Sequence, residues 1–341
     1  MKFLNHLDPA DYRLLKSIDD NWPFQFLSGF SRFYFHYHHS PVYIAYDEGL
    51  NAYMPMRFLM LKVFHPAQIL FAPIRNGVEL SAEEQAVFFK NFIWALYYRG
   101  HCERLIQPHP YGILADHPPG SKYCDFGTYI IDLGNQSEEQ IFNRFHPKYQ
   151  KAVTHSLKHD AKVRIGRETM DDFYKIYSHT MERVGLRFEA QEYFQELYNY
   201  LGEDHIAVGV VYDGGEPVSG IFLLYSKYSA FLTHAGTIGE SKLYGAAKLL
   251  NFEMMKYLRR KGVKRYDFVG VRINNQNPDL DGIFRFKKGF GGDLKKGYLW
   301  KLDLLPMKAR VYDSVVTFRS GKEKIKDIID QISETEQFSS H

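Results

Sequence analysis

The order of elements between Lys248 and Gly297 constrains the fold more than any other part of the sequence. Apolar residues first recur three or four positions apart, which predicts an amphipathic helix with Lys248 among the cations on its wet side. The helix would end at residues 259–262 (RRKG), where cations suit the negative end of the helix dipole and glycine takes the left-handed closing position. Residues 263–269 then form a strand. A crossover of this kind predicts a mixed or parallel sheet.

A basic, glycine-rich segment follows that strand. FRFKKGFGG, at Phe284–Gly292, is predicted to be a turn that sets Lys287 and Lys288 between three phenylalanine rings. Charge runs on loops are usually just solvated, and the rings would anchor the turn to the core. The residues by themselves therefore favour a structural interpretation of this segment.

The composition is that of a soluble enzyme. A chain of 341 residues is long enough for about two domains of ordinary size. A net charge of +3 is mild, so an anionic partner would be met by local patches, and no DNA partner is predicted. Cys102 and Cys124 are the two cysteines, which argues for a reducing compartment. The first residues lack an apolar signal core, and Phe92–Tyr98 is too short to span a bilayer. We therefore expect a cytoplasmic protein.

Two segments of the chain echo each other. Residues 42–60 and 206–225 each read as strand, tight turn and strand, with DEG in the first turn and DGG in the second. Each is followed by a predicted helix that ends on a basic residue and glycine, at residues 81–100 and 244–262. Two copies of one α/β unit would explain the pattern, and chance similarity between common patterns is the alternative.

Local signals predict the remaining elements. Ser137 with Gln140 predicts a capped short helix, and Pro147 opens another at its first position. Thr169 with Asp172 predicts a third cap. Further predictions are a helix over 189–200, a strand over 298–305, a largely helical segment over 307–332 and a frayed polar tail over 333–341.

These segments resemble the FemAB-type aminoacyltransferases, the peptidoglycan-bridge and lipid II transferases of the GNAT superfold. The likeness extends over roughly residues 125–300, and the N-terminal part is similar in layout only. The similar segments are TYIID at 128–132, HPKYQKAVTHSLKHDAKVRI at 146–165, ERVGLRFEAQEYF at 182–194, the RRKG helix end, KRYDFVG at 264–270 and FRFKKGFGG.

The resemblance implies an α/β (α+β) fold of two tandem GNAT-like domains, each a mixed twisted sheet flanked by helices. The first would comprise residues 1–140, joined by a C-terminal helix over 306–335 that returns to pack on it. The second would comprise residues 141–305 and carry the acyl-transfer motif.

The resemblance also implies a reaction. An aminoacyl group would pass from aminoacyl-tRNA, without a cofactor, to an amine of UDP-muramyl pentapeptide or its lipid-linked form. Such a reaction passes through an oxyanion, and Lys287 matches the lysine of the family's Phe-Lys pair that would stabilise it, while Phe286 would shield the acyl group from water. Asp267 would deprotonate or orient the amine, or else be an ordinary hydrogen-bonding residue at a strand end. No Ser-His-Asp or Cys-His order suggests a covalent intermediate, which favours direct attack.

Basic residues are the candidates for binding both substrates. Arg183, Arg187 and Tyr193 stand where the family keeps an arginine and a tyrosine for the precursor's phosphates, but Glu189 occupies the position expected for the arginine. A basic surface would contact tRNA phosphates, or would simply be a solvated helix face. A transient contact with the inner membrane face would accompany a lipid-linked acceptor. The other candidates are Arg32, Arg285 and Lys288 for the precursor, and Lys148, Lys151, Lys158, Lys295 and Lys296 for the tRNA surface.

Three alternatives stay open. The first is a CoA-dependent N-acyltransferase, because Lys242, Gly245 and Ala247 weakly match the GNAT turn that binds the CoA pyrophosphate. A non-catalytic module that binds the precursor is another. His36, His38 and His39 would place two imidazoles on one strand face and could seed a zinc site, but polar strand-end residues explain them better, and we expect no metal.

Overall fold

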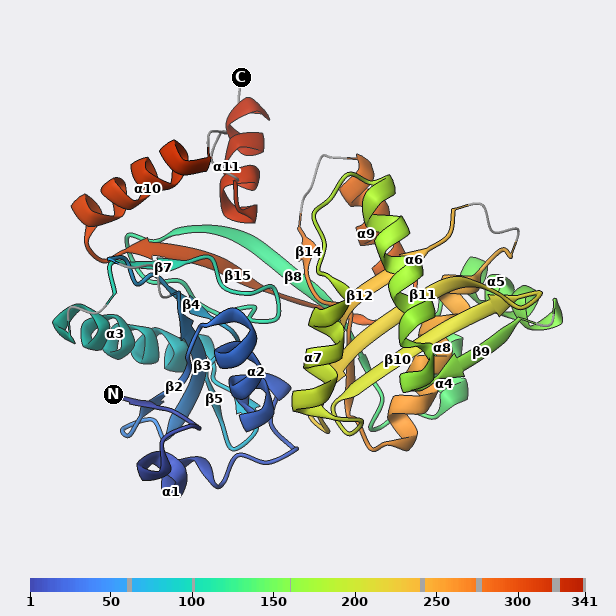
Figure 1. Ribbon diagram of the computed structural model, residues 1–341, viewed down its shortest axis with the longest axis horizontal. Helices are drawn as coiled ribbons and strands as arrows, with labels where there is room; N and C mark the ends of the chain where they lie inside the picture. Colours follow the sequence, from blue (N-terminus) through green and yellow to red (C-terminus); the bar gives the residue numbers. More distant parts are fainter. Residues whose placement is uncertain are drawn as a thin grey trace.

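The structure is a computed structural model that describes residues 1–59, 63–99, 102–159, 161–239, 243–273, 278–320 and 326–339. Figure 1 shows two halves side by side, with the N-terminal elements in one and the segments from α4 to α9 in the other. The first half contains short 3-10 turns at Pro9–Asp11 and Phe24–Phe26 together with β1 Lys2–Leu4, α1 Tyr12–Leu15, α2 Ser28–His38, β2 Val42–Asp47, β3 Ala52–Phe58, β4 Ala67–Ile69, β5 Ile74–Arg75, β6 Val78–Glu79, α3 Ala82–Arg99 and β7 Arg104–Ile106.

The second half is entered by a long strand and left by another. It contains β8 Lys122–Asp132, α4 Glu138–Arg144, α5 Pro147–Lys158, β9 Lys162–Ile165, a 3-10 turn at Arg167–Thr169, α6 Met170–Arg183, α7 Gln191–Leu201, β10 Ile206–Asp213, β11 Glu216–Tyr225, β12 Ala230–Thr237, α8 Ala246–Arg260, β13 Arg265–Asp267, β14 Val271–Arg272, α9 Pro278–Lys288 and β15 Asp293–Asp303. Two helices close the chain, α10 Pro306–Ser320 and α11 Ile328–Ser339.

One continuous sheet runs through both halves. Its strand order in the described chain is β1-β2-β3-β4-β7-β15-β8-β13-β12-β11-β10-β9. β15 is the link, since it pairs with β8 from Asp293↔Ile130 to Lys301↔Lys122 and then with β7 at Leu302↔Leu105. Most neighbours are antiparallel, but β12 runs parallel to β13, as the crossover through α8 requires. The predicted mixed sheet flanked by helices is confirmed.

Aromatic side chains fill the interface between the halves. Phe24 of the first half meets Phe231 of β12 edge to face, with ring centroids 5.3 Å apart, and Tyr111 packs on the same Phe231 ring at 5.6 Å. Phe24 and Phe231 belong to a buried cluster with residues from both halves. Such ring pairs contribute about 0.5–1.5 kcal/mol each beyond the area that they bury, so they help to fix the orientation of the two halves.

Several predicted elements are confirmed. Both strand-turn-strand units are present, and Ser81 and Glu84 form the expected reciprocal cap on α3. Ser137 and Gln140 form a capping box on α4, and Pro147 is at the start of α5. The cap predicted at Thr169 is wrong, because its hydroxyl instead donates to the carbonyl of Gly166, 2.8 Å away.

Other expectations were wrong in element type. Residues 284–288 belong to the last turns of helix α9, so Lys287 and Lys288 are helical and the predicted turn begins only at Gly289. His36 and His38 lie on helix α2, not on a strand, and His39 ends that helix with φ of 49°. The predicted frayed tail is helical over 333–339, where α11 continues.

The end of the described chain packs on the long strands. Ile329 of α11 is buried in a small cluster with Phe126 of β8 and Leu299 of β15. The carboxylate of Asp330 lies 2.6 Å from the Lys122 ammonium and 2.7 Å from that of Lys301. Helix α11 thus covers the strands that join the two halves.

Candidate active site

Helix α9 carries Lys287 into the interior. Its ammonium donates to the backbone carbonyls of Val269 and Gly270, at 2.5 and 2.6 Å. Burial lowers the pKa of Lys287 to about 8, against the upward pull of the nearby Asp267 carboxylate. These are its hydrogen-bond partners in the described chain, so one of its three N–H bonds is left for another oxygen. A buried cation of this kind can stabilise an oxyanion.

Asp267 holds the turn that Lys287 contacts. The carboxylate of Asp267 accepts hydrogen bonds from the Thr128 hydroxyl, at 2.5 Å, and from the Val269 N–H, at 2.7 Å. Val269 is a β-branched residue with φ of 49°, a conformation that costs energy and is held here by its neighbours. Burial raises the pKa of Asp267. Asp267 therefore positions the turn whose two carbonyls receive the Lys287 ammonium, and its carboxylate lies within electrostatic range of that ammonium.

A reaction that needs the Lys287 cation should show it in its pH profile. Because the pKa of this group is lowered to about 8, its charge is present below that pH and is lost as the pH rises through it. We expect kcat to fall above pH ~8. Arginine stays charged throughout this range, so residual turnover of Lys287→Arg should lack the alkaline limb. An unchanged limb in that variant would show that another group causes it.

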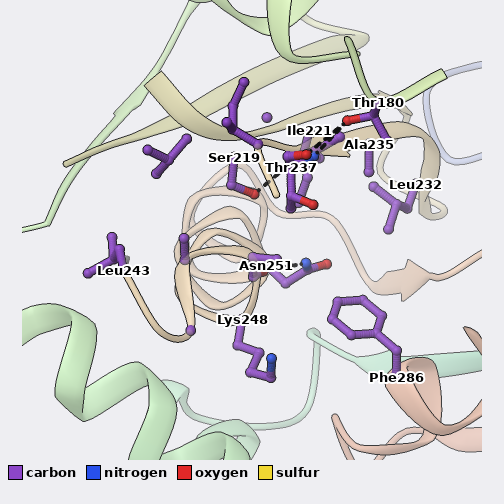
Figure 2. A pocket seen from close by; sticks show the side chains of 17 residues that line it. Thr180, Ser219, Ile221, Leu232, Ala235, Thr237, Leu243, Lys248, Asn251 and Phe286 are labelled. Carbon is purple, nitrogen blue, oxygen red and sulfur yellow. Dashed lines mark hydrogen bonds between the residues drawn. The ribbon is translucent and has the colours of Figure 1, made fainter. Parts of the chain in front are cut away.

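A cavity of about 440 Å³ lies between the sheet and the start of α8. Figure 2 shows Ser219 and Ile221 of β11 and Thr237 of β12 on one side, with Lys248 of α8 and Phe286 of α9 on the other. The cavity therefore reaches the residue that directly precedes Lys287.

The start of α8 requires glycine. Gly245 has φ of 100°, and a Cβ atom there would lie 2.5 Å from the carbonyl oxygen of Ala152 on α5. Gly245 and Ala247 both line the cavity, whereas Lys242 lies outside the described residues. Two of the three residues predicted for a CoA turn are thus brought to one cavity wall, at a helix start whose N–H groups favour anions.

Lys248 is a site residue that the sequence did not reveal. It was expected on the wet side of the helix, but it is partly buried and lines the cavity. Its ammonium lies 5.1 Å from the ring centroid of Tyr149 and 5.8 Å from that of Phe286, and burial lowers its pKa. The spacing of apolar residues could not show this, because the covering rings come from α5 and α9.

A second cavity, of about 510 Å³, lies between the two halves. We call it the interdomain cavity; it is lined by Tyr34, His38, His39, Ser40, Arg57, Leu59, His109 and Tyr111 of the first half and by Glu189, Tyr193, Thr233 and His234 of the second. A register shift in the β11–β12 pairing leaves Thr233 without an opposite residue on β11. Thr233 and His234 line this cavity, whereas Leu232 and Ala235 line the first one, so β12 separates the two.

The interdomain cavity borders the Asp267 site. The pKa of the Tyr111 hydroxyl is raised by burial, by Tyr34 and by the Asp267 carboxylate. Tyr111 lines the interdomain cavity, and the Asp267 carboxylate lies within electrostatic range of its hydroxyl.

Only some of the residues predicted to bind the precursor line a described cavity. Tyr193 lines the interdomain cavity, as does Glu189, which stands where an arginine was expected. Arg183, Arg187, Arg32, Arg285 and Lys288 are exposed, and none of them lines either cavity. The structure brings Tyr193 to a site, and it leaves those five cations on the surface.

Four of the five lysines predicted to contact tRNA are exposed, and the fifth is in an ion pair. Lys148, Lys151 and Lys158 are exposed on α5, and Lys296 is exposed on β15. Lys295 instead pairs with Glu79 of the first half, at 2.5 Å, so this ammonium already has an anionic partner.

No group of three or more His, Cys, Asp or Glu side chains in the described chain could hold a metal ion, so His36, His38 and His39 form no such group. No helix among the described residues is both long enough and apolar enough to cross a membrane.

Comparisons with known proteins agree with this arrangement. A family model described as an acetyltransferase (GNAT) domain matches residues 148–288, the part of the chain that contains both Lys248 and Lys287. Among solved structures, a crystal structure of FemX aligns with a TM-score of 0.65 at 14% identity, covering 91% of this chain and 99% of that one. The structure of L-PGS from Bacillus licheniformis aligns with a TM-score of 0.50 at 14% identity, covering 94% and 99%. At these identities the likeness shows the fold.

The curated relatives of this chain are aminoacyltransferases. The chain is 27% identical over 191 residues to a UDP-N-acetylmuramoylpentapeptide-lysine N(6)-alanyltransferase of Weissella viridescens, covering 55% of each chain. It is 22% identical to a lipid II:glycine glycyltransferase of Staphylococcus haemolyticus, covering 46% of this chain and 54% of the relative. It is also 22% identical to the aminoacyltransferase FemA of Staphylococcus epidermidis, covering 50% and 36%. The chain thus spans about half the length of the first two relatives and less of the third. The chain is therefore a homologue of the FemAB-type aminoacyltransferases and carries a GNAT domain.

Proposed function

We propose that this protein is an aminoacyltransferase that passes an aminoacyl group from aminoacyl-tRNA to an amine of a peptidoglycan precursor peptide. The observation that carries the proposal is the buried Lys287 ammonium, held by two backbone carbonyls directly after Phe286, which lines the cavity at the start of α8. The homologues named above act on such precursors, which supports the choice of acceptor. The proposal places the reaction in the cytoplasm, where aminoacyl-tRNA is made.

In this scheme the donor's acyl group lies in the cavity beside Phe286. The acceptor amine approaches from the interdomain cavity and attacks the ester carbonyl directly. A tetrahedral oxyanion forms, and the free N–H of Lys287 stabilises it. The C–O bond to the tRNA ribose then breaks as the amide forms, and the amine's proton leaves with the ribose hydroxyl or to solvent.

A CoA-dependent N-acyltransferase is the second candidate. The cavity at the start of α8 favours it, because Gly245 and Ala247 offer helix N–H groups to a pyrophosphate. Both donors would place their acyl group near Phe286, so the two candidates differ in which donor the protein accepts.

The test is a donor comparison. UDP-muramyl pentapeptide is incubated with the protein and either total tRNA charged with all amino acids or a set of acyl-CoA donors, and the precursor is weighed by mass spectrometry. A gain of one amino-acid residue in the tRNA reaction alone supports the first candidate and identifies the amino acid. Acylation only with CoA supports the second. No gain with either donor contradicts both, as would be expected of a non-catalytic homologue.

Filling the cavity at the start of α8 should weaken donor binding. Ala247 lines it, so Ala247→Phe is expected to raise the donor KM about tenfold or more, with a smaller change in the acceptor KM. Ala86→Phe, at an exposed position of α3 in the other half, is the control and should change neither KM. Equal increases in both KM values for Ala247→Phe would contradict the assignment of this cavity to the donor.

A further inference from the structure

The interdomain cavity carries one charged group of each sign. Among the described residues that line it, Arg57 and Glu189 are the charged side chains at neutral pH once the histidines are neutral. Burial lowers the pKa of His38 and of His234 to about 4 each, and that of His109 to about 3, so these three imidazoles are neutral near pH 7. His39, the fourth histidine of the lining, is exposed. The walls therefore offer a cation, an anion and several neutral polar rings.

Arg57 is held in place from two sides. Its Nε donates to the Gln68 side chain, at 2.9 Å, and its guanidinium lies 4.9 Å from the ring centroid of Tyr34. Among the described residues, these contacts leave the terminal N–H groups available for a forked contact with a carboxylate. Burial raises the pKa of the same Tyr34 hydroxyl, Arg57 lowers it to a smaller extent, and the Glu189 carboxylate raises it, so both charges lie within electrostatic range of Tyr34. The two opposite charges thus flank one tyrosine.

The cavity also contains a buried polar atom without a partner. Nδ1 of His109 is buried and makes no hydrogen bond with the described residues. The ring stacks on Tyr111, with centroids 3.9 Å apart, and lines the interdomain cavity. A buried nitrogen of this kind is costly unless a bound molecule or water satisfies it.

We propose that the interdomain cavity binds an amphoteric peptide segment, with Glu189 holding an ammonium group and Arg57 a carboxylate, and that it does not clamp a diphosphate. A diphosphate needs several cations, and among the described residues this lining has one permanent cation beside an anion that would repel it. A cavity of about 510 Å³ suits a ligand of dipeptide size. Tyr111 of this cavity and Lys287 both lie within electrostatic range of Asp267, so in this proposal a peptide held here brings its amine toward Lys287.

The acceptor role of the peptide rests on the function proposed above, but its binding does not. Binding is therefore measured directly, by calorimetry with the intact protein and L-alanyl-L-lysine as probe. We expect Glu189→Gln to weaken this binding about tenfold, as the loss of one charge-assisted contact would. Glu192→Gln, at an exposed position in the first turn of α7, is the matched control and should bind as the wild type does.

Altered ligands test both contacts without altering the protein. The dipeptide acetylated at both amines should bind about tenfold more weakly, and equally to the wild type and Glu189→Gln. Its methyl ester, which lacks the carboxylate that Arg57 would hold, should also bind more weakly to the wild type. Pyrophosphate and UDP should bind more weakly than the dipeptide, and Glu189→Gln should not weaken them.

Three results would overturn the inference: no binding of the dipeptide by the wild type, equal binding by Glu189→Gln, or tighter binding of pyrophosphate or UDP than of the dipeptide. Turnover is assayed separately with charged tRNA. Dipeptide binding that depends on Glu189, without turnover, would keep the inference and contradict the proposed function. Turnover of UDP-muramyl pentapeptide without dipeptide binding would do the reverse.

Discussion

Lys287→Met is expected to lower kcat by about 10²- to 10³-fold, the usual cost of removing one oxyanion donor. Methionine is close to lysine in length, so the surrounding packing should persist. KM values should change little, because Lys287 lines neither described cavity and its contribution is made in the transition state. The measurement is steady-state kinetics with the donor that the comparison of charged tRNA and acyl-CoA selects, and Lys288→Met, at the exposed neighbouring position, is the control. Equal losses in the two variants would contradict a specific role for Lys287.

The same variant should stay folded. Burial lowers the pKa of Lys287 from 10.5 to about 8, which corresponds to a penalty of about 3 kcal/mol on the folded state while the group is charged. Removing the amine relieves that penalty but leaves the carbonyls of Val269 and Gly270 without this donor, at a cost of similar size. We expect the free energy of unfolding at pH 7 to change by no more than about 1 kcal/mol. The wild type, but not the variant, should gain stability between pH 8 and 10.5, where the folded state has released this proton and the unfolded state has not.

Gly291→Ala is expected to destabilise the protein by about 3 kcal/mol or more. Gly291 has φ of 69°, and a Cβ atom there would lie 2.0 Å from the carbonyl oxygen of Arg144 at the end of α4. One of the two backbones would have to move, which would displace the link between α9 and β15. The free energy of unfolding, measured by denaturant titration, is the readout.

Gly262→Ala separates the two causes of that loss. Gly262 also has a positive φ, of 80°, but a Cβ atom there would meet nothing within 4 Å. Its cost should be about 1–2 kcal/mol, from the left-handed conformation alone. Equal costs at the two positions would show that the contact with Arg144 relaxes freely.

The sequence predicted the elements whose signals are local. The spacing of Leu250, Met254 and Leu258 identified the buried face of α8, and all three are buried. The caps of α3 and α4 depend on residues three positions apart, so the sequence predicted them too. The echo between residues 42–60 and 206–225 predicted two hairpins because turn residues fix such units locally.

The errors arose where distant contacts decide the structure. The glycine-rich sequence made residues 284–288 look like a turn, but they continue helix α9, whose Phe286 ring lies 5.2 Å from the fully buried ring of Phe290 beyond the helix end. Packing of this kind outweighs the low helix propensity of glycine. The interdomain cavity was invisible for a related reason. Arg57, His109 and Glu189 are far apart in sequence, and only the packing of the two halves brings them together.

The unbroken ladder of β15 has a consequence for how substrates enter. This strand pairs with β7 on one side of the junction and with β8 on the other, so a rotation of one half against the other must break or shear backbone hydrogen bonds. A hinge works best where a few loop residues absorb the change, and here regular strands occupy that place. We therefore expect the two halves to keep a fixed position relative to each other. Selectivity for the acceptor would then come from the fixed width of the gap between the halves, which the acceptor must fit without any closing motion.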